Sequence, residues 1–168
     1  DTKLLFIGQK GEDLHEVMSN TLIDYSAAIS AGKFRRYHGE SFISHLLDIK
    51  TVALNFRDFF RFLKGLLDSW ILLRKYRPQT IFLKGGFVSV PVGVVARFLR
   101  IPYITHDSDA VPGLANRLTA KHAKYNLTAL PSDLYPYNPN KTKQVGIPLQ
   151  STFKRVTDTV RDIAKKEL

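Results

Sequence analysis

Short apolar runs alternate along the chain with longer segments in which apolar residues recur every three or four positions. The short runs are typical of buried strands and the longer segments of amphipathic helices. Strands that alternate with helices indicate a Rossmann-like α/β fold, a parallel sheet with helices on both faces. The predicted strands are 3–8, 25–30, 80–84, 101–105, 124–130 and 143–146. The predicted helices are 11–20, 55–76, 88–99 and 113–122, with residues 32–39 as a loop.

The longest predicted helix, 55–76, has a stripe of apolar residues at helical spacing, and the simplest interpretation is that this stripe packs against the sheet. The stripe consists of Phe56, Phe59, Phe60, Leu63, Leu66, Leu67 and Trp70. Phe62 and Leu72 do not share one face with Trp70, so the alternative is an exposed apolar edge that touches a membrane surface. The cations that flank this edge are Arg57, Arg61 and Lys64.

The sequence is strongly basic and contains no cysteine. With 25 Lys and Arg against 15 Asp and Glu, its formal net charge is +10. This balance favours nucleic acid, anionic lipid or phosphate-bearing ligands without choosing among them. The lack of cysteine excludes disulfides, thiolate metal sites and a cysteine nucleophile. The histidines lack metal-ligand spacing, and no apolar stretch reaches the roughly 18 residues of a spanning helix, so we expect no metal, no cofactor and no membrane-spanning segment.

The predicted strand 80–84 ends in two glycines, after which a helix begins. Gly85 and Gly86 allow the backbone to approach a ligand and to present free amides at a helix N-terminus, which is phosphate-binding geometry. Lys84 and Ser89 add a positive charge and a hydroxyl. A pair of glycines alone also fits a tight turn that binds nothing.

A run of four polar residues follows the strand 101–105, at the edge where open parallel sheets bind their ligands. These residues are His106, Asp107, Ser108 and Asp109. Asp107 and Asp109 also fit the Asp-x-Asp pattern that holds a divalent ion and a nucleotide diphosphate, but a pattern with two fixed positions is nearly nonspecific. The plain alternative is helix capping and hydrogen bonding within the loop.

A compact basic and aromatic segment, 32–37, lies in the predicted loop after the second strand. Its cations are Lys33, Arg35 and Arg36, which alternate with Phe34 and Tyr37. Such a patch is suited to phosphates, lipid head groups or single-stranded nucleic acid. An ordinary solvated loop is the alternative.

Three stretches, taken together, closely resemble the MurG family in order and spacing. They are 84–91 (Lys-Gly-Gly-Phe-Val-Ser-Val-Pro), Ile101-Pro102, and 106–117 (His-Asp-Ser-Asp-Ala-Val-Pro-Gly-Leu-Ala-Asn-Arg). The agreement extends to Gly8, Glu12, 32–37, Arg77-Pro78 and 145–148. The resemblance implies that residues 1–150 form the N-terminal, acceptor-binding half of a GT-B glycosyltransferase. Residues 151–168 are then a linker or the start of a C-terminal donor domain.

The resemblance also implies two groups of site residues. The residues expected at the diphosphate of the lipid acceptor are Gly85, Gly86, Phe87 and Ser89. The residues expected in the cleft and at the donor sugar are His106, Asp107, Asp109, Asn116, Arg117 and Gln150. Asp107 stands where the family has a glutamate, and Gln150 where it has an arginine near the donor. The two basic segments add expected membrane or head-group contacts at Lys33, Arg35, Arg36, Arg61, Phe62 and Lys64.

The family opens with a strand and a Gly-Gly-x-x-Gly-His loop whose histidine is its proposed catalytic base, and this sequence begins after both. We therefore expect no catalytic base in this chain and no activity from the chain alone. In a Rossmann half, that first strand lies in the centre of the sheet, here between the strands at 4–7 and 81–83. Without it, these two strand edges are expected to meet a gap or to pair directly.

The function that the resemblance implies is transfer of GlcNAc from UDP-GlcNAc to the undecaprenyl-linked lipid I, which makes lipid II for peptidoglycan synthesis. The implied location is the cytoplasmic face of the plasma membrane, with an anionic membrane surface and a C-terminal donor domain as partners and without nucleic acid. One alternative is a noncatalytic, lipid-acceptor-binding subunit of a split glycosyltransferase. A basic nucleic-acid-binding domain, favoured only by charge and residues 33–37, is a second alternative that predicts salt-sensitive binding.

Overall fold

The computed structural model describes residues 2–14, 19, 22–32 and 49–149. The strands are β1 (Leu5–Gln9), β2 (Tyr25–Ile29), β3 (Ile81–Leu83), β4 (Tyr103–Asp107), β5 (Tyr125–Thr128) and β6 (Thr142–Gln144). The helices are α3 (Ile49–Tyr76), α4 (Ser89–Phe98) and α5 (Leu114–Ala120), with short 3-10 turns η1 (Ser132–Leu134) and η2 (Pro139–Lys141). The predicted parallel α/β class is therefore confirmed. The boundary at 150 and the tail 151–168 lie outside the described residues.

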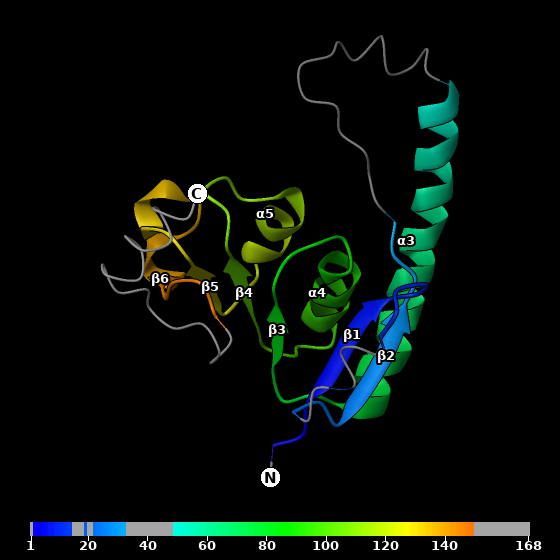
Figure 1. The fold of residues 1–168 in the computed structure, drawn as a ribbon, viewed down its shortest axis with the longest axis horizontal. Coiled ribbons are helices and arrows are strands. Elements are labelled where there is room, and N and C mark those ends of the chain that lie inside the picture. The colour runs from blue at the N-terminus through cyan, green and yellow to red at the C-terminus, as the bar shows by residue number, and fades with distance from the viewer. Residues whose placement is uncertain (1, 15–18, 20–21, 33–48, 150–168) are drawn as a thin grey trace, which may run out of the picture.

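The described strands form two parallel sheets, one of order β1-β2 and one of order β3-β4-β5-β6. Figure 1 shows them in the order β6, β5, β4, β3, β1, β2 from left to right, so the break between the sheets falls between β3 and β1. Of the two outcomes expected for these strand edges, a gap or direct pairing, the described residues show the gap.

The three helices form one layer, in which α4 packs against both α3 and α5 (Figure 1). Beneath them lies the core, to which both sheets contribute. It consists of Ile29, Leu73, Leu83, Val92, Val95, Ala96, Tyr103 and Ala123. Burial of these side chains is the main force that holds helices and sheets together. A helical layer on the opposite face of the sheet, which the sequence also predicts, is not among the described residues.

The helix predicted at 11–20 is wrong over residues 11–14, where the chain forms a turn and an irregular segment. Gly11 has a φ of +95°, a left-handed conformation that cannot begin a right-handed helix. The turn is closed by Glu12, whose amide donates to the Gln9 carbonyl at 3.2 Å and whose side chain accepts from the Gln9 amide at 3.1 Å. Residues 15–18 and 20 of the predicted helix lie outside the described residues.

Most of the apolar stripe of α3 faces outward, so the prediction that it packs against the sheet is wrong for most of its members. Phe56, Phe60 and Leu67 are 65%, 53% and 66% exposed. Leu66 is the member that does pack against the core. The buried face of α3 carries instead Asp58, Gly65, Ser69 and Leu73. The alternative prediction, an exposed apolar edge, describes this helix.

Close backbone contact explains why the small residues of α3 face inward. A Cβ on Gly65 would lie 2.2 Å from the Ser30 carbonyl oxygen, and a Cβ on Gly32 would lie 1.9 Å from the Asp58 carbonyl oxygen. The helix backbone therefore touches the segment that follows β2. Bulky aromatic side chains cannot occupy an interface this close, and they are left on the outer face.

Other boundaries shift by a few residues, as hydrogen bonding at the ends of elements decides them. The helix predicted at 55–76 begins at Ile49 and ends as predicted before Pro78, where Arg77 adopts a φ of +45°. Strand β4 extends beyond the predicted 101–105 because Asp107 pairs with Thr128 of β5. His106 and Asp107 therefore belong to the strand and not to the loop after it.

Candidate functional site

The Gly85–Gly86 turn joins β3 to α4 in a conformation that only glycine adopts readily. Gly85 has a φ of +98° and Gly86 a φ of +76°. The buried Ser89 holds the turn, because its hydroxyl donates to the Gly85 carbonyl and its amide donates to the Gly86 carbonyl. Ser89 was expected to reach a phosphate, but in this structure its hydroxyl supports the turn. Phe87 is half-buried beside it.

Val88, the N-cap residue of α4, makes no side-chain capping hydrogen bond. The Ser89 amide already donates to the Gly86 carbonyl and Pro91 has no N–H, so Val90 carries the amide that is left among the first three residues of the helix. The first amides of a helix need partners, and together with the helix dipole they favour an anion. Lys84 is exposed at the end of β3 and adds a positive charge nearby. The arrangement suits a phosphate group.

Asn116 of α5 lies directly against Gly85. A Cβ on Gly85 would come within 2.9 Å of Asn116 Oδ1 and 3.1 Å of its Nδ2. Asn116 is only 7% exposed, and its Nδ2 donates to the His106 carbonyl oxygen at 3.4 Å. The turn after β3, the end of β4 and the first turn of α5 therefore meet at this amide. Gly85 is required here both for its φ and for lack of space.

His106 is fully buried and uses both ring nitrogens within the fold. Nε2 donates to the Gly146 carbonyl oxygen at 2.9 Å, because a carbonyl can only accept. Nδ1 then accepts from the Ser108 hydroxyl at 3.3 Å. Its ring lies 6.2 Å from that of Phe82 on β3. His106 thus fixes the loop after β6 to the end of β4.

Asp107 is also committed within the fold. It is 2% exposed and accepts a hydrogen bond of 2.6 Å from the Tyr137 hydroxyl. Burial, and then the hydrogen bond to Asp107, raise the pKa of Tyr137 well above its usual value, so this phenol remains a donor. The Tyr135 hydroxyl donates to the Asp109 carbonyl oxygen at 2.9 Å, while Asp109 itself is exposed.

Tyr135 and Tyr137, whose rings stack at 5.8 Å, clamp residues 107–109 from the segment between β5 and β6. Sequence reasoning missed both tyrosines, and it missed Gly146 as the partner of His106. The available signal was a Tyr-Pro-Tyr pattern shortly after a predicted strand, where two hydroxyls at alternate positions can reach one neighbouring loop.

Arg117 lies apart from Asn116, although the two are adjacent in α5. Arg117 lines a hollow of about 440 Å³ between α5 and η2, together with Lys121, Asn126, Tyr137 and Lys141. Asn116 points inward to Gly85. The structure therefore brings together Gly85, Gly86, Asn116 and His106, and it places Arg117 at a separate basic hollow. Gln150 lies outside the described residues.

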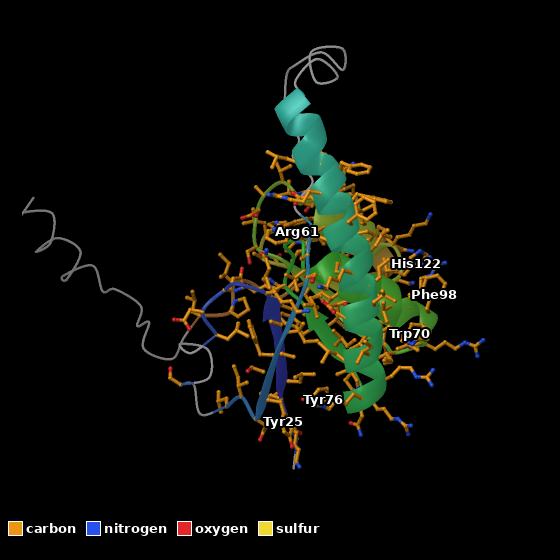
Figure 2. The ribbon with its side chains drawn as sticks, turned by 90° about the vertical axis from the view of Figure 1, so that its right-hand side faces the viewer. Tyr25, Arg61, Trp70, Tyr76, Phe98 and His122 are labelled. Atoms are coloured by element: carbon orange, nitrogen blue, oxygen red, sulfur yellow. The ribbon has the colours of Figure 1, made fainter. Side chains whose placement is uncertain are left out.

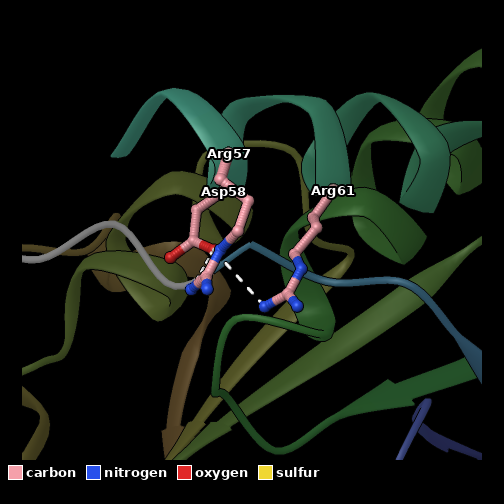
Figure 3. Close-up of polar contacts among 3 residues, drawn as sticks. All are labelled: Arg57, Asp58 and Arg61. Carbon is pink, nitrogen blue, oxygen red and sulfur yellow. Dashed lines mark hydrogen bonds and ion pairs between the residues drawn. The ribbon is translucent and has the colours of Figure 1, made fainter. Parts of the chain in front are cut away.

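Of the residues expected to contact the membrane, some lie on α3 and the others lie outside the described residues. Lys64 is exposed on α3, Phe62 is half-buried, and Arg61 is exposed and pairs with the buried carboxylate of Asp58 at 3.6 Å. Arg57 pairs with the same carboxylate at 3.2 Å, and Figure 3 shows the two guanidinium groups on Asp58. Lys33, Arg35 and Arg36 lie outside the described residues.

The outer face of α3 and the neighbouring α4 present large apolar side chains. Trp70 is 42% exposed and Phe98 75% exposed, and both lie to the same side of α3 in Figure 2. The Arg74 guanidinium lies over the Trp70 ring, 5.7 Å from its centroid. No helix within the described ranges is both long enough and apolar enough to cross a membrane. In the same part of the chain, no three His, Asp or Glu side chains are grouped to hold a metal ion.

Comparison with known proteins decides the family. The profile of the glycosyltransferase family 28 N-terminal domain matches residues 2–128. The chain belongs to this family. The predicted likeness to MurG is confirmed by relatives of this glycosyltransferase family and by a solved structure.

Two curated relatives carry the same name, UDP-N-acetylglucosamine--N-acetylmuramyl-(pentapeptide) pyrophosphoryl-undecaprenol N-acetylglucosamine transferase. The protein of Clostridium perfringens (strain SM101) is 37% identical over 148 residues, which are 88% of this chain and 38% of the relative. The protein of Staphylococcus epidermidis (strain RP62A) is 38% identical over 151 residues, 89% of this chain and 39% of the relative. The chain thus spans under two fifths of the length of these family members.

The crystal structure of Acinetobacter baumannii MurG superposes with a TM-score of 0.61 at 18% identity. The superposition covers 89% of this chain and 38% of that one. It confirms the Rossmann-like fold predicted for this member of glycosyltransferase family 28.

Proposed function

We propose that this chain is the acceptor-binding part of an N-acetylglucosaminyltransferase that converts lipid I to lipid II in peptidoglycan synthesis. The observation that carries the proposal is the uncapped α4 N-terminus behind Gly85 and Gly86, packed against Asn116. Relatives of 36–38% identity are named for transfer of N-acetylglucosamine to an N-acetylmuramyl pyrophosphoryl-undecaprenol. A pyrophosphoryl group is the chemistry that this turn is suited to bind.

The diphosphate of the acceptor lies, in this proposal, over Gly86. The space around this glycine is open, since a Cβ there would meet no atom within 4 Å. The Val90 amide and the positive end of the α4 dipole attract phosphate oxygens, and Lys84 balances their charge. No metal is needed for this contact. Ser89 holds the turn through its two hydrogen bonds, and the half-buried Phe87 lies beside it.

The reaction that we propose for the whole protein is an inverting transfer. A base removes the proton of the acceptor hydroxyl, the oxygen attacks the anomeric carbon of the donor sugar, and UDP leaves with the electrons of the broken bond. His106 and Asp107 are both held by hydrogen bonds within the fold. In this proposal the base is the histidine of the family's Gly-Gly-x-x-Gly-His loop, and most of the contacts to UDP-GlcNAc come from a donor-binding domain, both outside the described residues.

The residues proposed for the cleft and the donor sugar are His106, Asp107, Asp109, Asn116, Arg117 and Gln150. His106 and Asp107 act by shaping the end of β4, and Asp109 is exposed. The hollow at Arg117 extends the cationic surface along α5.

The proposed location is the cytoplasmic face of the plasma membrane, with the outer face of α3 against the lipid. Phe56, Phe59 and Phe60 form an exposed aromatic cluster there. The ring centroid of Phe60 lies 4.9 Å from that of Phe56 and 5.8 Å from that of Phe59. Lys64, Arg74 and Lys75 supply positive charge for anionic head groups.

A noncatalytic acceptor-binding subunit of a split glycosyltransferase is the second candidate. The hydrogen bonds that hold His106 and Asp107 within the fold favour it, because neither residue is then positioned as the catalytic base. In that case the donor site and the base belong to a separate chain. The two candidates share the acceptor site and differ in where the chemistry occurs.

The experiment that tests the proposal measures transfer of labelled GlcNAc from UDP-GlcNAc to a lipid I analogue by the full-length protein. Transfer supports the enzyme, and binding of the analogue without transfer supports the noncatalytic subunit. Neither transfer nor binding would overturn both. A salt-sensitive affinity for unrelated DNA in the absence of analogue binding would instead support a nucleic-acid-binding role.

A further inference from the structure

Asn116 has a buried hydrogen-bond acceptor that the fold leaves unused. Asn116 is only 7% exposed, and among the described residues nothing donates to its Oδ1. Buried polar atoms in folded proteins are almost always paired, because an unpaired acceptor loses its hydration and gains nothing in return. An unpaired atom at a proposed binding turn therefore points to a partner that arrives with the ligand.

The orientation of the amide group follows from its surroundings. Nδ2 donates to the His106 carbonyl oxygen at 3.4 Å. Exchanging the two ends of the amide would place Oδ1 against that carbonyl oxygen, and two acceptors would face each other. Nδ2 is therefore fixed toward β4, and Oδ1 lies against Gly85, within 2.9 Å of the position that a Cβ would take there.

Gly85 lies against this oxygen. Neither Gly85 nor Gly86 carries a side chain, and the space around Gly86 is open. Access to Oδ1 for a ligand that lies over Gly86 therefore requires a displacement of the turn away from α5. A diphosphate at neutral pH offers only acceptors, so it cannot supply the missing partner. A hydroxyl or an amide N–H beside the diphosphate can.

We propose that Asn116 Oδ1 accepts a hydrogen bond from a hydroxyl or amide N–H of a sugar attached to the diphosphate bound at the Gly85–Gly86 turn. This inference rests on the proposed diphosphate site and adds selectivity to it. The α4 N-terminus holds the diphosphate, and Asn116 distinguishes a glycosylated diphosphate from a bare one. Asn116 is thus a specificity-determining residue for the acceptor.

The test compares two soluble probes by titration calorimetry on the full-length protein. One is methyl diphosphate, which has no donor group beyond the phosphates. The other is N-acetylmuramyl methyl diphosphate, which adds the sugar. The unaltered protein is expected to prefer the sugar probe, and Asn116→Ala is expected to lose roughly three- to tenfold of that preference, the value of one hydrogen bond. Its affinity for methyl diphosphate should fall by less than its affinity for the sugar probe.

A control variant and a control probe separate selectivity from folding. Leu118→Ala changes an exposed residue of the same helix and should alter neither affinity. If Asn116→Ala does not fold, the unaltered protein is titrated with sugar probes in which each hydroxyl is replaced by fluorine or the amide by an ester. One of these probes should lose the same preference, and retention of the preference by all of them would overturn the inference.

The remaining outcomes distinguish this inference from the proposal beneath it. If the unaltered protein binds both probes equally, or if Asn116→Ala weakens both to the same extent, the inference is wrong and the diphosphate site stands. If the unaltered protein binds neither probe, the diphosphate site fails and the inference fails with it.

Discussion

Gly65 of α3 and Ser30 after β2 touch backbone to backbone, since a Cβ on Gly65 would lie 2.2 Å from the Ser30 carbonyl oxygen. This contact fixes the height of α3 over the sheet. One turn further along, the Asp68 carboxylate accepts from the Ser30 amide at 2.8 Å. The two contacts hold the longest helix to the end of a short strand.

Gly65→Ala should therefore destabilise the protein. A methyl group gains a little helix propensity but collides with a backbone atom that cannot rotate away, and overpacking of this kind costs about 1 to 3 kcal/mol. Urea denaturation followed by circular dichroism measures the change. Gly93→Ala in α4 is the matched control, because its Cβ would meet side-chain atoms of Thr119 and Leu83 at 2.9 Å and 3.1 Å. A Gly93 variant as damaging as the Gly65 variant would contradict the backbone argument.

The packing of α3 also shows where sequence reasoning reaches its limit. The strands, their parallel arrangement and the end of α3 at Pro78 follow from local apolar runs and from proline geometry. The buried face of α3 does not, because it is decided by Gly32 and Gly65, which are 33 positions apart and admit a close backbone approach. Periodicity alone favoured the aromatic stripe, the more apolar of two possible faces.

The binding site, too, was only partly predictable from the sequence. Gly85 and Gly86 were identified because positive φ values and a following helix leave a local signature. The hydrogen bonds that occupy His106 and Asp107 come from Gly146 and Tyr137, which are 40 and 30 residues away. Contacts at that distance depend on how the chain returns over β5, so the Tyr-Pro-Tyr pattern alone does not identify Asp107 as its partner.

Asp68 should make the stability of the protein sensitive to acid. Burial alone would raise the pKa of Asp68, but hydrogen bonds from the Lys10 side chain and from Ser30 outweigh it, so the pKa is lowered. A carboxylate with a lowered pKa contributes stability above the pKa of the unfolded chain, about 4, and loses it as the pH falls through the folded value. Lys10 is 49% exposed, so solvent weakens its share.

We expect Asp68→Asn to lower the free energy of unfolding by about 1 kcal/mol at neutral pH, with the difference shrinking below about pH 4. Urea denaturation across this pH range measures both effects. Asp133→Asn, an exposed substitution on η1, should follow the parent profile. A constant difference between parent and Asp68→Asn at all pH values would show that the charge of Asp68 is irrelevant.

Removing the Tyr137 hydroxyl should destabilise the end of β4. Tyr137→Phe leaves the buried Asp107 carboxylate without this donor, which costs about 1 to 3 kcal/mol. Tyr135→Phe removes a bond to the neutral carbonyl of Asp109 and should cost less, about 1 kcal/mol. Thermal unfolding at neutral pH compares the two variants. Equal losses would mean that the charge on Asp107 does not strengthen its bond to Tyr137.

Gly86→Ala should weaken binding of the lipid I analogue more than it weakens the fold. At a φ of +76° an alanine is strained, and the turn that presents the α4 amides must change shape. Gly11→Ala is a close control, because Gly11 has a φ of +95° and equally open space but belongs to the turn after β1 and not to the turn before α4. Both variants should lose about 1 kcal/mol of stability. Only Gly86→Ala should lose analogue affinity, by roughly tenfold or more, and equal affinities would refute the diphosphate site.

Membrane attachment should depend on the aromatic face of α3. Phe59 and Phe60 are 46% and 53% exposed, so replacing both by serine removes apolar surface without opening the core. Burial of aromatic side chains in lipid is worth enough that the double variant should bind phosphatidylglycerol-containing vesicles at least about tenfold more weakly in sedimentation assays. Leu134→Ser on η1, 56% exposed, is the control for a general loss of apolar surface.

The salt dependence of this binding separates its two components. Cations such as Lys64 act through screened charge, so added salt should weaken binding of the parent and of the double variant by similar factors. The aromatic contribution should persist in high salt. If Phe59 and Phe60 can be replaced without effect while Leu134→Ser reduces binding, the membrane contacts the face that carries η1. The exposed aromatic face of α3 then serves to bind another partner.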